Sequence, residues 1–263
     1  MKIVSLSENK NIEKRVAITP EIAKKYISTG FEVFLPKDYA IHLGFNNEEY
    51  KSQGVKILEN EKDIIEKSDV IVQLNLPRDD ILSNLKENQN LIGVLNPYVN
   101  KDKLENLSKN KVNVFSLELL PRITRAQSMD ILSSQANLAG YKAVIESFAN
   151  FGKAIPMMMT AAGTVPAAKV LIVGAGVAGL QAIATAKRMG AIVFATDVRM
   201  ASKEQVESLG GKFLTVEGAE NLETEGGYAK EASDEFKKKQ EDLLSETLKK
   251  IDIVICSALI PGK

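Results

Sequence analysis

The most informative stretch of the chain reads VLIVGAGVAGLQAIATAKRMGAIVFATD, from residue 170 to residue 197. An apolar run at 170–173 leads through a glycine-rich turn into an apolar-periodic segment that ends at Gly190, and a second apolar run follows at 192–197. This order predicts a strand, a turn, a helix and a second strand. Such a unit is typical of a parallel α/β sheet.

The turn has the spacing Gly-x-Gly-x-x-Gly, in which each glycine has a separate role. Gly174 makes the tight turn, Gly176 lets the backbone approach a pyrophosphate, and Gly179 lets the helix pack closely on the strand. The helix then directs free N–H groups and its positive dipole end at the phosphates. Asp197 ends the second strand, where a carboxylate accepts hydrogen bonds from the adenosine ribose and repels a 2′-phosphate. The stretch predicts binding of NAD(H) in preference to NADP(H); the alternative is a purely structural tight turn.

Length and composition are those of a soluble, two-domain globular protein. The chain has 263 residues, of which 44% are hydrophobic and 26% charged. Its 34 acidic and 34 basic residues balance, so we expect neither nucleic acid nor an anionic membrane as its main partner. No apolar run approaches the about 18 residues of a membrane-spanning helix, and the N-terminus lacks a signal core. We therefore expect the chain itself to be soluble and cytoplasmic.

The N-terminal half of the chain alternates strand-like and helical patterns, which predicts a doubly wound parallel sheet in a domain spanning residues 1–121. Thr19 and Pro20 have the residue types of an N-cap and a first helical position. The predicted strands lie at 2–6, 31–35, 55–57, 69–75, 91–95 and 112–118, and the predicted helices at 21–30, 46–54, 62–67, 79–88 and 101–110.

Residues 122–151 predict a long linker helix with an unusually polar start, which is either a solvated helix terminus or one wall of a ligand site. Residues 152–263 predict the second, nucleotide-binding domain, with strands at 170–173, 192–197, 212–216 and 252–257 and helices at 202–209 and 241–250. Because sheets of this type commonly have six strands, we expect this one to be incomplete, through truncation or completion by a partner.

Other features have simpler interpretations. The charged segment 217–239 is either a surface insertion or a mobile lid over the nucleotide. The methionines at 157–159 predict core packing, and the single cysteine, Cys256, predicts a buried, reduced thiol in a strand. His42 is the only histidine, and a loop or packing role is expected for it. Without a cluster of cysteines and histidines, we predict no metal site.

Several segments carry a resemblance to a known family: RITRAQSMDILSSQANLAGYKAV, PMMMTAAGTVPAAKVLIVGAGVAGLQAIATAKRMGA, ATDVR, KEQVESLGGKF, GGYAKE and SALIPGK. They resemble the NAD(H)-binding domain of the alpha subunit of proton-translocating NAD(P) transhydrogenase. The similarity is nearly continuous from Leu119 to Lys263 and looser before it, where RVAITPE and GFEV are similar. The implied fold is α/β, with two Rossmann-like doubly wound parallel-sheet domains joined by a long helix.

Alanine dehydrogenase shares this fold and glycine motif and is the alternative reading. Those enzymes carry a lysine in the strand corresponding to VIVQLNLP and a histidine near the strand corresponding to LIGVLNP. This chain has Gln73, Asn75 and Asn96 in those stretches. We therefore do not expect it to dehydrogenate an amino acid. A third possibility is a module that binds NAD without catalysis.

The resemblance implies roles for particular residues. Arg122 would contact the nicotinamide carboxamide, Asp130 and Ser133 would hold Arg122 and the nicotinamide, and Gln127 would reach toward the nicotinamide ribose and the facing NADP(H). The other implied cofactor-binding residues are Ile123, Thr124, Arg125, Gly174, Gly176, Val177, Ala178, Gly179, Asp197, Val198, Arg199, Gly227, Tyr228, Gln240 and Leu259.

The resemblance also implies an assembly. Hydride would pass directly between NAD(H) on this chain and NADP(H) on a partner domain, coupled to proton translocation by a membrane-spanning partner subunit. The chain would be a homodimer, extrinsic to the cytoplasmic side of the bacterial inner membrane. Members of this family continue past PGK, so the resemblance favours truncation as the reason for the missing strands.

Overall fold

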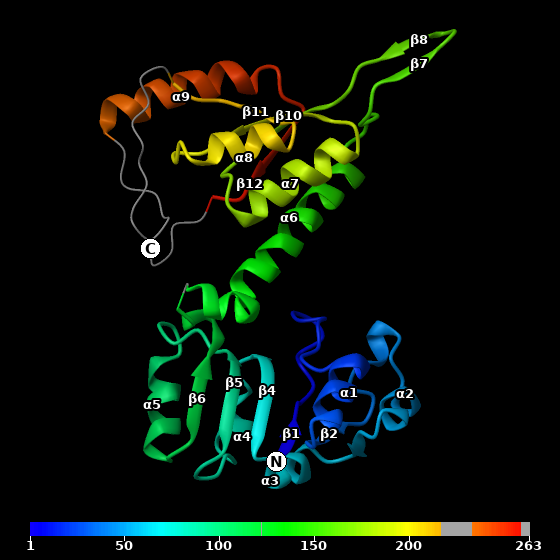
Figure 1. Cartoon of the computed structure of the whole chain (residues 1–263), viewed down its shortest axis with the longest axis vertical. Coiled ribbons are helices and arrows are strands. Elements are labelled where there is room, and N and C mark those ends of the chain that lie inside the picture. The colour runs from blue at the N-terminus through cyan, green and yellow to red at the C-terminus, as the bar shows by residue number, and fades with distance from the viewer. Residues whose placement is uncertain (122, 217–232, 259–263) are drawn as a thin grey trace. The chain divides into compact units, whose positions relative to one another are not determined.

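A computed structural model describes residues 1–121, 123–216 and 233–258 of the chain. The chain forms two compact units, Met1–Ile131 and Leu132–Lys263 (Figure 1). Among the described residues, no helix is long and apolar enough to cross a membrane.

The first unit contains a parallel sheet of six strands in the order β3-β2-β1-β4-β5-β6 among the residues described. This strand order is that of doubly wound dinucleotide-binding folds. The strands are β1 (Lys2–Val4), β2 (Glu32–Pro36), β3 (Lys56–Leu58), β4 (Val70–Asn75), β5 (Asn90–Val94) and β6 (Asn113–Ser116). The helices are α1 (Pro20–Ser28), α2 (Asn47–Ser52), α3 (Glu61–Lys67), α4 (Asp79–Leu82) and α5 (Lys101–Lys109), with short 3-10 helices η1 (Ile41–Leu43), η2 (Leu117–Leu119) and η3 (Thr124–Met129).

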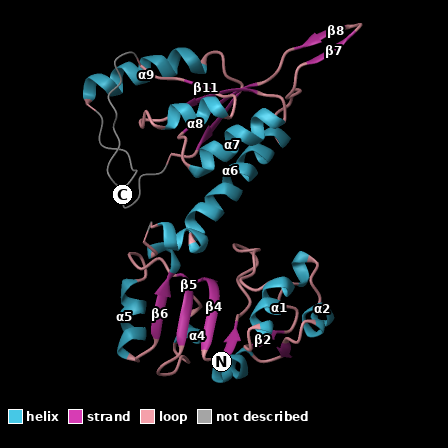
Figure 2. Ribbon diagram, in the orientation of Figure 1, coloured by secondary structure: helices cyan, strands magenta, loops and turns pink. Residues whose placement is uncertain are grey.

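Both faces of this sheet are buried. Neighbouring residues on a strand point to opposite faces, and they belong to two different apolar clusters. Ile3 and Val33 belong to one apolar cluster, which includes residues of α1 and α2. Val4 and Phe34 belong to a second cluster, which includes residues of α3, α4 and α5. Helices therefore cover both faces, as the predicted fold class requires (Figure 2).

Helix α1 begins as the sequence predicts, and α4 does not continue as predicted. The Thr19 hydroxyl accepts a hydrogen bond from the Ile22 N–H at 3.4 Å, and Pro20 is the first helical residue. Helix α4, expected over 79–88, ends at Leu82. Ser83 follows α4, and its hydroxyl bonds the Asp80 carbonyl. Serine and asparagine compete in this way for backbone hydrogen bonds, which favours turns over helix interiors.

The predicted helix over 122–151 is wrong in its first section. Thr124–Met129 forms η3, Asp130 has extended backbone (φ −73°, ψ 90°), and α6 (Ile131–Ala149) begins only after it. The residues before Ile131 are mostly polar, and such side chains favour turns and helix starts because they bond the backbone themselves. The polar stretch therefore lies in a 3-10 turn that precedes the helix.

The second unit contains a parallel sheet of four described strands in the order β11-β10-β9-β12. The strands are β9 (Lys169–Val173), β10 (Ile192–Thr196), β11 (Lys212–Phe213) and β12 (Ile253–Cys256), and the helices α7 (Val177–Arg188), α8 (Ser202–Ser208) and α9 (Asp234–Leu248) accompany them. This is the order of the first four strands of the other sheet, so the prediction of two doubly wound parallel sheets is confirmed. Helix α9 begins seven residues before the predicted start at 241.

The core of the second unit joins the sheet to α6, α7 and α8. Val144 on α6, Val170 on β9 and Ile183 on α7 are fully buried in one cluster. Helices α6 and α7 lie side by side (Figure 1), and a Cβ atom on Gly140 would lie 2.0 Å from the Ala178 carbonyl oxygen. Only glycine permits this approach, so α6 packs backbone to backbone against the start of α7.

Two packing predictions in this unit are wrong. The methionines expected in the core lie at the start of an antiparallel hairpin of β7 (Met158–Thr160) and β8 (Gly163–Val165), which extends away from the sheet (Figure 1). Met159 is 73% exposed. Cys256 is in a strand as predicted, but it is exposed. Because side chains alternate along β12, Ile255 faces the core and Cys256 faces away from it.

Candidate nucleotide-binding site

The glycine turn lies at the point of the second sheet where the strand order reverses direction. From β9 the chain proceeds outward through β10 and β11 on one side, and β12 pairs with β9 on the other. Ligands of open α/β sheets bind beyond the carboxyl ends of the strands at such a point. Gly174 follows β9 directly with φ +95°, and a Cβ atom there would lie 2.7 Å from the Ala258 nitrogen. Backbone conformation and the neighbouring chain both require glycine here.

The start of α7 is tightly packed on one side and open on the other. A Cβ atom on Gly179 would lie 1.8 Å from the Gly174 carbonyl oxygen, which also accepts a 2.8 Å hydrogen bond from the Ser257 hydroxyl. A Cβ atom on Gly176 would meet nothing nearer than the Arg199 guanidinium, at 3.9 Å. The first N–H groups of a helix have no partner within the helix. The turn therefore presents backbone donors at an open surface, which suits a phosphate.

Asp197 connects the end of β10 to this turn. Its carboxylate accepts hydrogen bonds from the Ala175 N–H at 2.7 Å and from the Arg199 N–H at 2.9 Å. The Arg199 guanidinium donates two more, both at 2.9 Å. Burial raises the pKa of Asp197, but the hydrogen bonds from Arg199 and Ala175 outweigh it and hold the pKa below its ordinary value. The sequence indicated Asp197 and missed its pairing with Arg199.

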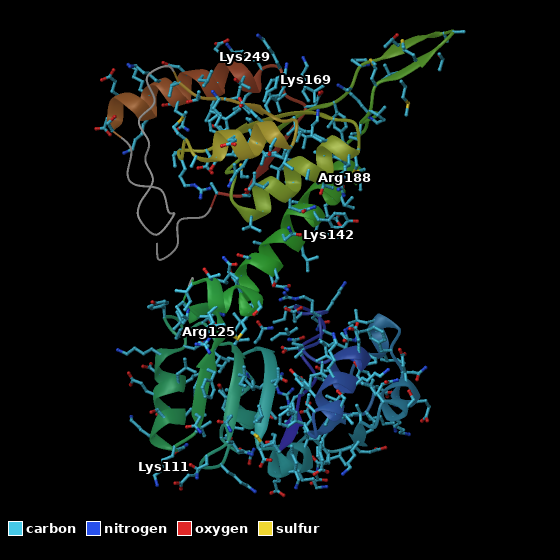
Figure 3. The ribbon with its side chains drawn as sticks, viewed as in Figure 1. Lys111, Arg125, Lys142, Lys169, Arg188 and Lys249 are labelled. Atoms are coloured by element: carbon cyan, nitrogen blue, oxygen red, sulfur yellow. The ribbon has the colours of Figure 1, made fainter. Side chains whose placement is uncertain are left out.

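The polar stretch assigned to the nicotinamide lies in two units. Arg125 is exposed on η3, which follows β6 and η2 in the chain (Figure 3). Gln127 is also exposed on η3, and Asp130 is half-buried at its end. Ile123 and Thr124, at the start of η3, are exposed too. Ser133, in the first turn of α6, belongs to the second unit and is half-buried.

The remaining predicted contacts are only partly described. Val198, beside Asp197, is half-buried, as are Ala178 and, on α9, Gln240, whereas Val177 is 42% exposed. The other predicted residues lie outside the described residues of the chain: Arg122, Gly227, Tyr228 and Leu259. Of the predicted lid, 217–239, residues 217–232 also lie outside the described part of the chain. Its last residues form the start of α9.

The first unit has a polar network at the equivalent point of its own sheet, where β1 and β4 pair. Gln73 at the end of β4 is 5% exposed. Its amide oxygen accepts hydrogen bonds from the Ser5 hydroxyl at 2.9 Å and the Leu6 N–H at 2.7 Å, and its amide nitrogen donates to Glu8 at 3.2 Å. Gln73 therefore ties the ends of the two strands together.

Glu8 completes this network. Its carboxylate accepts from the N–H groups of Leu74 at 2.9 Å and Asn75 at 3.3 Å, and from the Asn75 amide at 3.3 Å. Glu8 was not predicted from the sequence, because it bonds residues more than sixty positions away and no local pattern indicates such a contact.

Two further polar groups lie on the segments around these strand ends. The Tyr39 hydroxyl lies 2.7 Å from the Ser5 hydroxyl. Burial raises the pKa of Tyr39 to about 12. Hydrogen bonds from Arg15 lower the pKa of Glu13 to about 2. His42, expected in a loop or packing role, lies in the short 3-10 helix η1, where its Nε2 is 2.7 Å from the Lys14 carbonyl oxygen. Over the described residues no cluster of His, Cys, Asp or Glu could hold a metal ion.

Comparison with known proteins agrees with this geometry. The family model described as "Alanine dehydrogenase/PNT, N-terminal domain" matches residues 5–139, and the one described as "Alanine dehydrogenase/PNT, C-terminal domain" matches residues 143–263. A solved structure of transhydrogenase from Sinorhizobium meliloti is 44% identical with a TM-score of 0.88, over 99% of this chain and 71% of that one.

Curated relatives separate the two subfamilies. An NAD(P) transhydrogenase alpha-subunit protein of Rhodospirillum rubrum is 49% identical over 100% of this chain and 70% of its own length. An alanine dehydrogenase of Methanococcus maripaludis is 25% identical, over 97% of this chain and 63% of its own. The chain therefore belongs to the alanine dehydrogenase/PNT family and, within it, to the NAD(P) transhydrogenase alpha subunits.

Proposed function

We propose that this chain is the NAD(H)-binding component of a proton-translocating NAD(P)+ transhydrogenase. The observation that carries the proposal is the open glycine turn at the end of β9, with Asp197 hydrogen-bonded to it, in a chain of the transhydrogenase alpha-subunit family. The pyrophosphate would lie over Gly174–Gly179 at the start of α7, where backbone donors and the helix dipole favour an anion.

The rest of the nucleotide would be held by segments on either side of that turn. Asp197, Val198 and Arg199 would contact the adenosine ribose, and four residues outside this loop would add contacts: Gly227, Tyr228, Gln240 and Leu259. Since an ionised carboxylate accepts hydrogen bonds from both ribose hydroxyls, Asp197 favours NAD(H).

The nicotinamide would be positioned by the residues around η3. Arg122 would donate to the carboxamide oxygen, and Asp130 and Ser133 would hold Arg122 and the ring in place. Gln127 would reach toward the nicotinamide ribose and the facing NADP(H), with Ile123, Thr124 and Arg125 beside it. The nicotinamide, when bound, supplies the carbon that gives or receives hydride.

This reaction requires positioning from the protein and no proton transfer by a side chain. Hydride would pass directly between two nicotinamides, so the residues of this chain would act by fixing one ring in place. Holding reactants in a productive geometry is worth up to about 7–11 kcal/mol of activation free energy. Exposed η3 side chains such as Gln127 and Arg125 are compatible with a partner domain that docks over the ring.

The proposal includes the assembly. The chain would form a homodimer, dock onto an NADP(H)-binding domain, and attach through it to a membrane-spanning subunit that couples hydride transfer to proton movement. This places the chain as an extrinsic component on the cytoplasmic side of the bacterial inner membrane. The names of its relatives, which specify an alpha subunit, support an arrangement of several subunits.

The alternative, an amino-acid dehydrogenase of the alanine type, has weaker support. Gln73 and Asn75 have no titratable side chain at neutral pH, and both bond Glu8. Formation of NADH by the isolated protein in the presence of alanine would favour this alternative over the proposal.

The test mixes the full-length subunit with a separately prepared NADP(H)-binding domain of the same family and follows reduction of an NAD analogue by NADPH. We expect turnover only in the mixture; a folded mixture without turnover would contradict the proposal. Arg122→Ala should reduce the rate of hydride transfer more than the affinity for NADH. Arg188→Ala, at the exposed end of α7 (Figure 3), is the control and should change neither.

A further inference from the structure

The Asp197 carboxylate has its hydrogen-bonding capacity filled by the protein itself. It accepts four hydrogen bonds, from the backbone N–H groups of Ala175 and Arg199 and from two nitrogens of the Arg199 guanidinium. A carboxylate offers about four lone-pair sites. Ribose hydroxyls that bind Asp197 must therefore replace some of the Arg199 interaction.

The Arg199 guanidinium bonds Asp197 and also lies near the open side of the glycine turn. Its side chain is 23% exposed, whereas that of Asp197 is 7% exposed. One guanidinium nitrogen lies 3.9 Å from the position of a Cβ atom on Gly176. The positive charge is thus next to the surface on which the nucleotide would lie, and it is paired in a fork geometry that favours carboxylate and phosphate alike.

This pairing changes the charge that a nucleotide would meet. An unpaired carboxylate at the end of the second strand repels a 2′-phosphate, whereas a nearby arginine accommodates one. The paired groups Asp197 and Arg199 have no net charge together. We propose that Arg199 is a specificity-determining residue of this site, which weakens the rejection of a 2′-phosphorylated nucleotide that Asp197 alone would impose. The inference rests on the proposed function in so far as the nucleotide binds at this turn.

Substitution of Arg199 separates charge from loop geometry. The hydrogen bonds from the Ala175 and Arg199 backbone N–H groups to Asp197 do not depend on the arginine side chain. In Arg199→Met, therefore, Asp197 stays anchored, loses its counter-ion and regains two acceptor positions for ribose hydroxyls. Arg199→Lys keeps the charge and loses the fork.

The experiment uses the full chain with bound NADH, followed by fluorescence, and displaces it with two probes that differ only by a 2′-phosphate: 5′-AMP and adenosine 2′,5′-bisphosphate. In Arg199→Met we expect the ratio of the bisphosphate to the AMP dissociation constant to rise at least about fivefold, because the carboxylate charge is no longer compensated. Arg199→Lys should keep the ratio within about threefold of the original. Asp197→Asn should lower it.

Several outcomes would overturn the inference. One is a ratio of dissociation constants that stays constant or falls in Arg199→Met. Another is a ratio in Arg199→Lys that equals the ratio in Arg199→Met. The third is a bisphosphate that displaces NADH from neither the original chain nor Arg199→Met. Each would mean that the Arg199 charge does not act on the 2′ position. Thermal melting checks that each variant folds, and Arg199→Gln replaces Arg199→Met if the latter does not. An original chain that fails to bind NADH would instead contradict the proposed function itself.

Discussion

The four strands of the second sheet have the same order as the first four strands of the first sheet. The two sheets differ in the residues that lie beyond the carboxyl ends of their central strands. In the first, β1 and β4 meet at the reversal point, and the side chains of Gln73 and Glu8 fill the space beyond them with hydrogen bonds to the strand ends. In the second, β9 and β12 meet at a glycine turn, where a Cβ atom on Gly176 would meet nothing nearer than 3.9 Å. Strand order therefore indicates where a ligand could bind, but side-chain size and hydrogen bonding decide whether it fits.

The largest effect is expected from a substitution in the glycine turn that follows β9. Gly179→Val would place a Cβ atom 1.8 Å from the Gly174 carbonyl oxygen, so the turn must move. We expect NADH binding to be lost and the free energy of unfolding to fall by about 3 kcal/mol or more. Urea unfolding and NADH fluorescence measure the two effects.

Gly152→Val is the matched control, because a Cβ atom at Gly152 would meet nothing within 4 Å. It should leave both measurements close to those of the original protein. Normal NADH binding by Gly179→Val would show that close packing of this turn is unimportant for the site.

A second variant disrupts the hydrogen-bond network of Gln73 and Glu8 at the carboxyl end of the first sheet. Gln73→Leu removes the acceptor of the Ser5 hydroxyl and the Leu6 N–H, both buried. Unsatisfied buried groups should lower the free energy of unfolding by about 2–3 kcal/mol. NADH affinity should change less than about twofold, because we assign binding to the other sheet.

Gln205→Leu, on the exposed surface of α8, serves as its control and should unfold like the original protein. A large loss of NADH affinity in Gln73→Leu would mean that the two sheet ends do not have the separate roles described above.

Ionised groups make the region around the first sheet's carboxyl end sensitive to acid. Hydrogen bonds from Arg15 lower the pKa of Glu13 to about 2, so the pair stabilises the fold at neutral pH, and that contribution is lost as the pH falls from about 4 toward 2. Glu13 is 12% exposed, but Arg15 is 53% exposed, and solvent screening reduces the effect. Glu13→Gln should therefore cost about 1 kcal/mol at neutral pH.

Urea unfolding at several pH values tests this, and the difference between Glu13→Gln and the original protein should shrink on acidification. Glu48→Gln, in an exposed pair with Lys51, should show no measurable difference at any pH. A Glu13→Gln difference that is constant with pH would rule out the ionised pair as its cause.

The smallest effect is expected at the end of β12. Cys256 is exposed on β12, next to the end of β9 and its glycine turn. Cys256→Ser should change the free energy of unfolding by less than about 0.5 kcal/mol. It should leave NADH affinity within about twofold of the original. A loss of tenfold or more by NADH titration would extend the site to the end of β12.

The sequence was most informative where one residue type is required by local geometry. Gly174 has a positive φ, and Thr19 caps α1, and both features follow from local chemistry. The alternation of strands and helices likewise predicted both parallel sheets. The family resemblance, which the comparisons confirm, extended these features to a set of proposed site residues that the structure alone does not test.

Features that depend on distant segments of the chain were missed. The exposure of Met159 depends on the hairpin of β7 and β8, which no other part of the described chain covers, and that of Cys256 depends on which face of β12 meets the core. The network around Glu8 joins residues more than sixty positions apart. The pairing of Arg199 with Asp197 is local, but its two-nitrogen geometry is set by how the loop after β10 folds.

The contact between Gly140 and Ala178 fixes a length. Since α6 and the glycine turn touch through their backbones, neither can slide along the other without a steric clash. Ser133 lies seven residues earlier on the same helix, a rise of about 10 Å. Helix α6 thus fixes the distance between the turn proposed for the pyrophosphate and Ser133, one of the residues proposed for the nicotinamide. A side chain at position 140 would push α6 away from α7 and change this distance, although every residue proposed to contact the ligand would still be present.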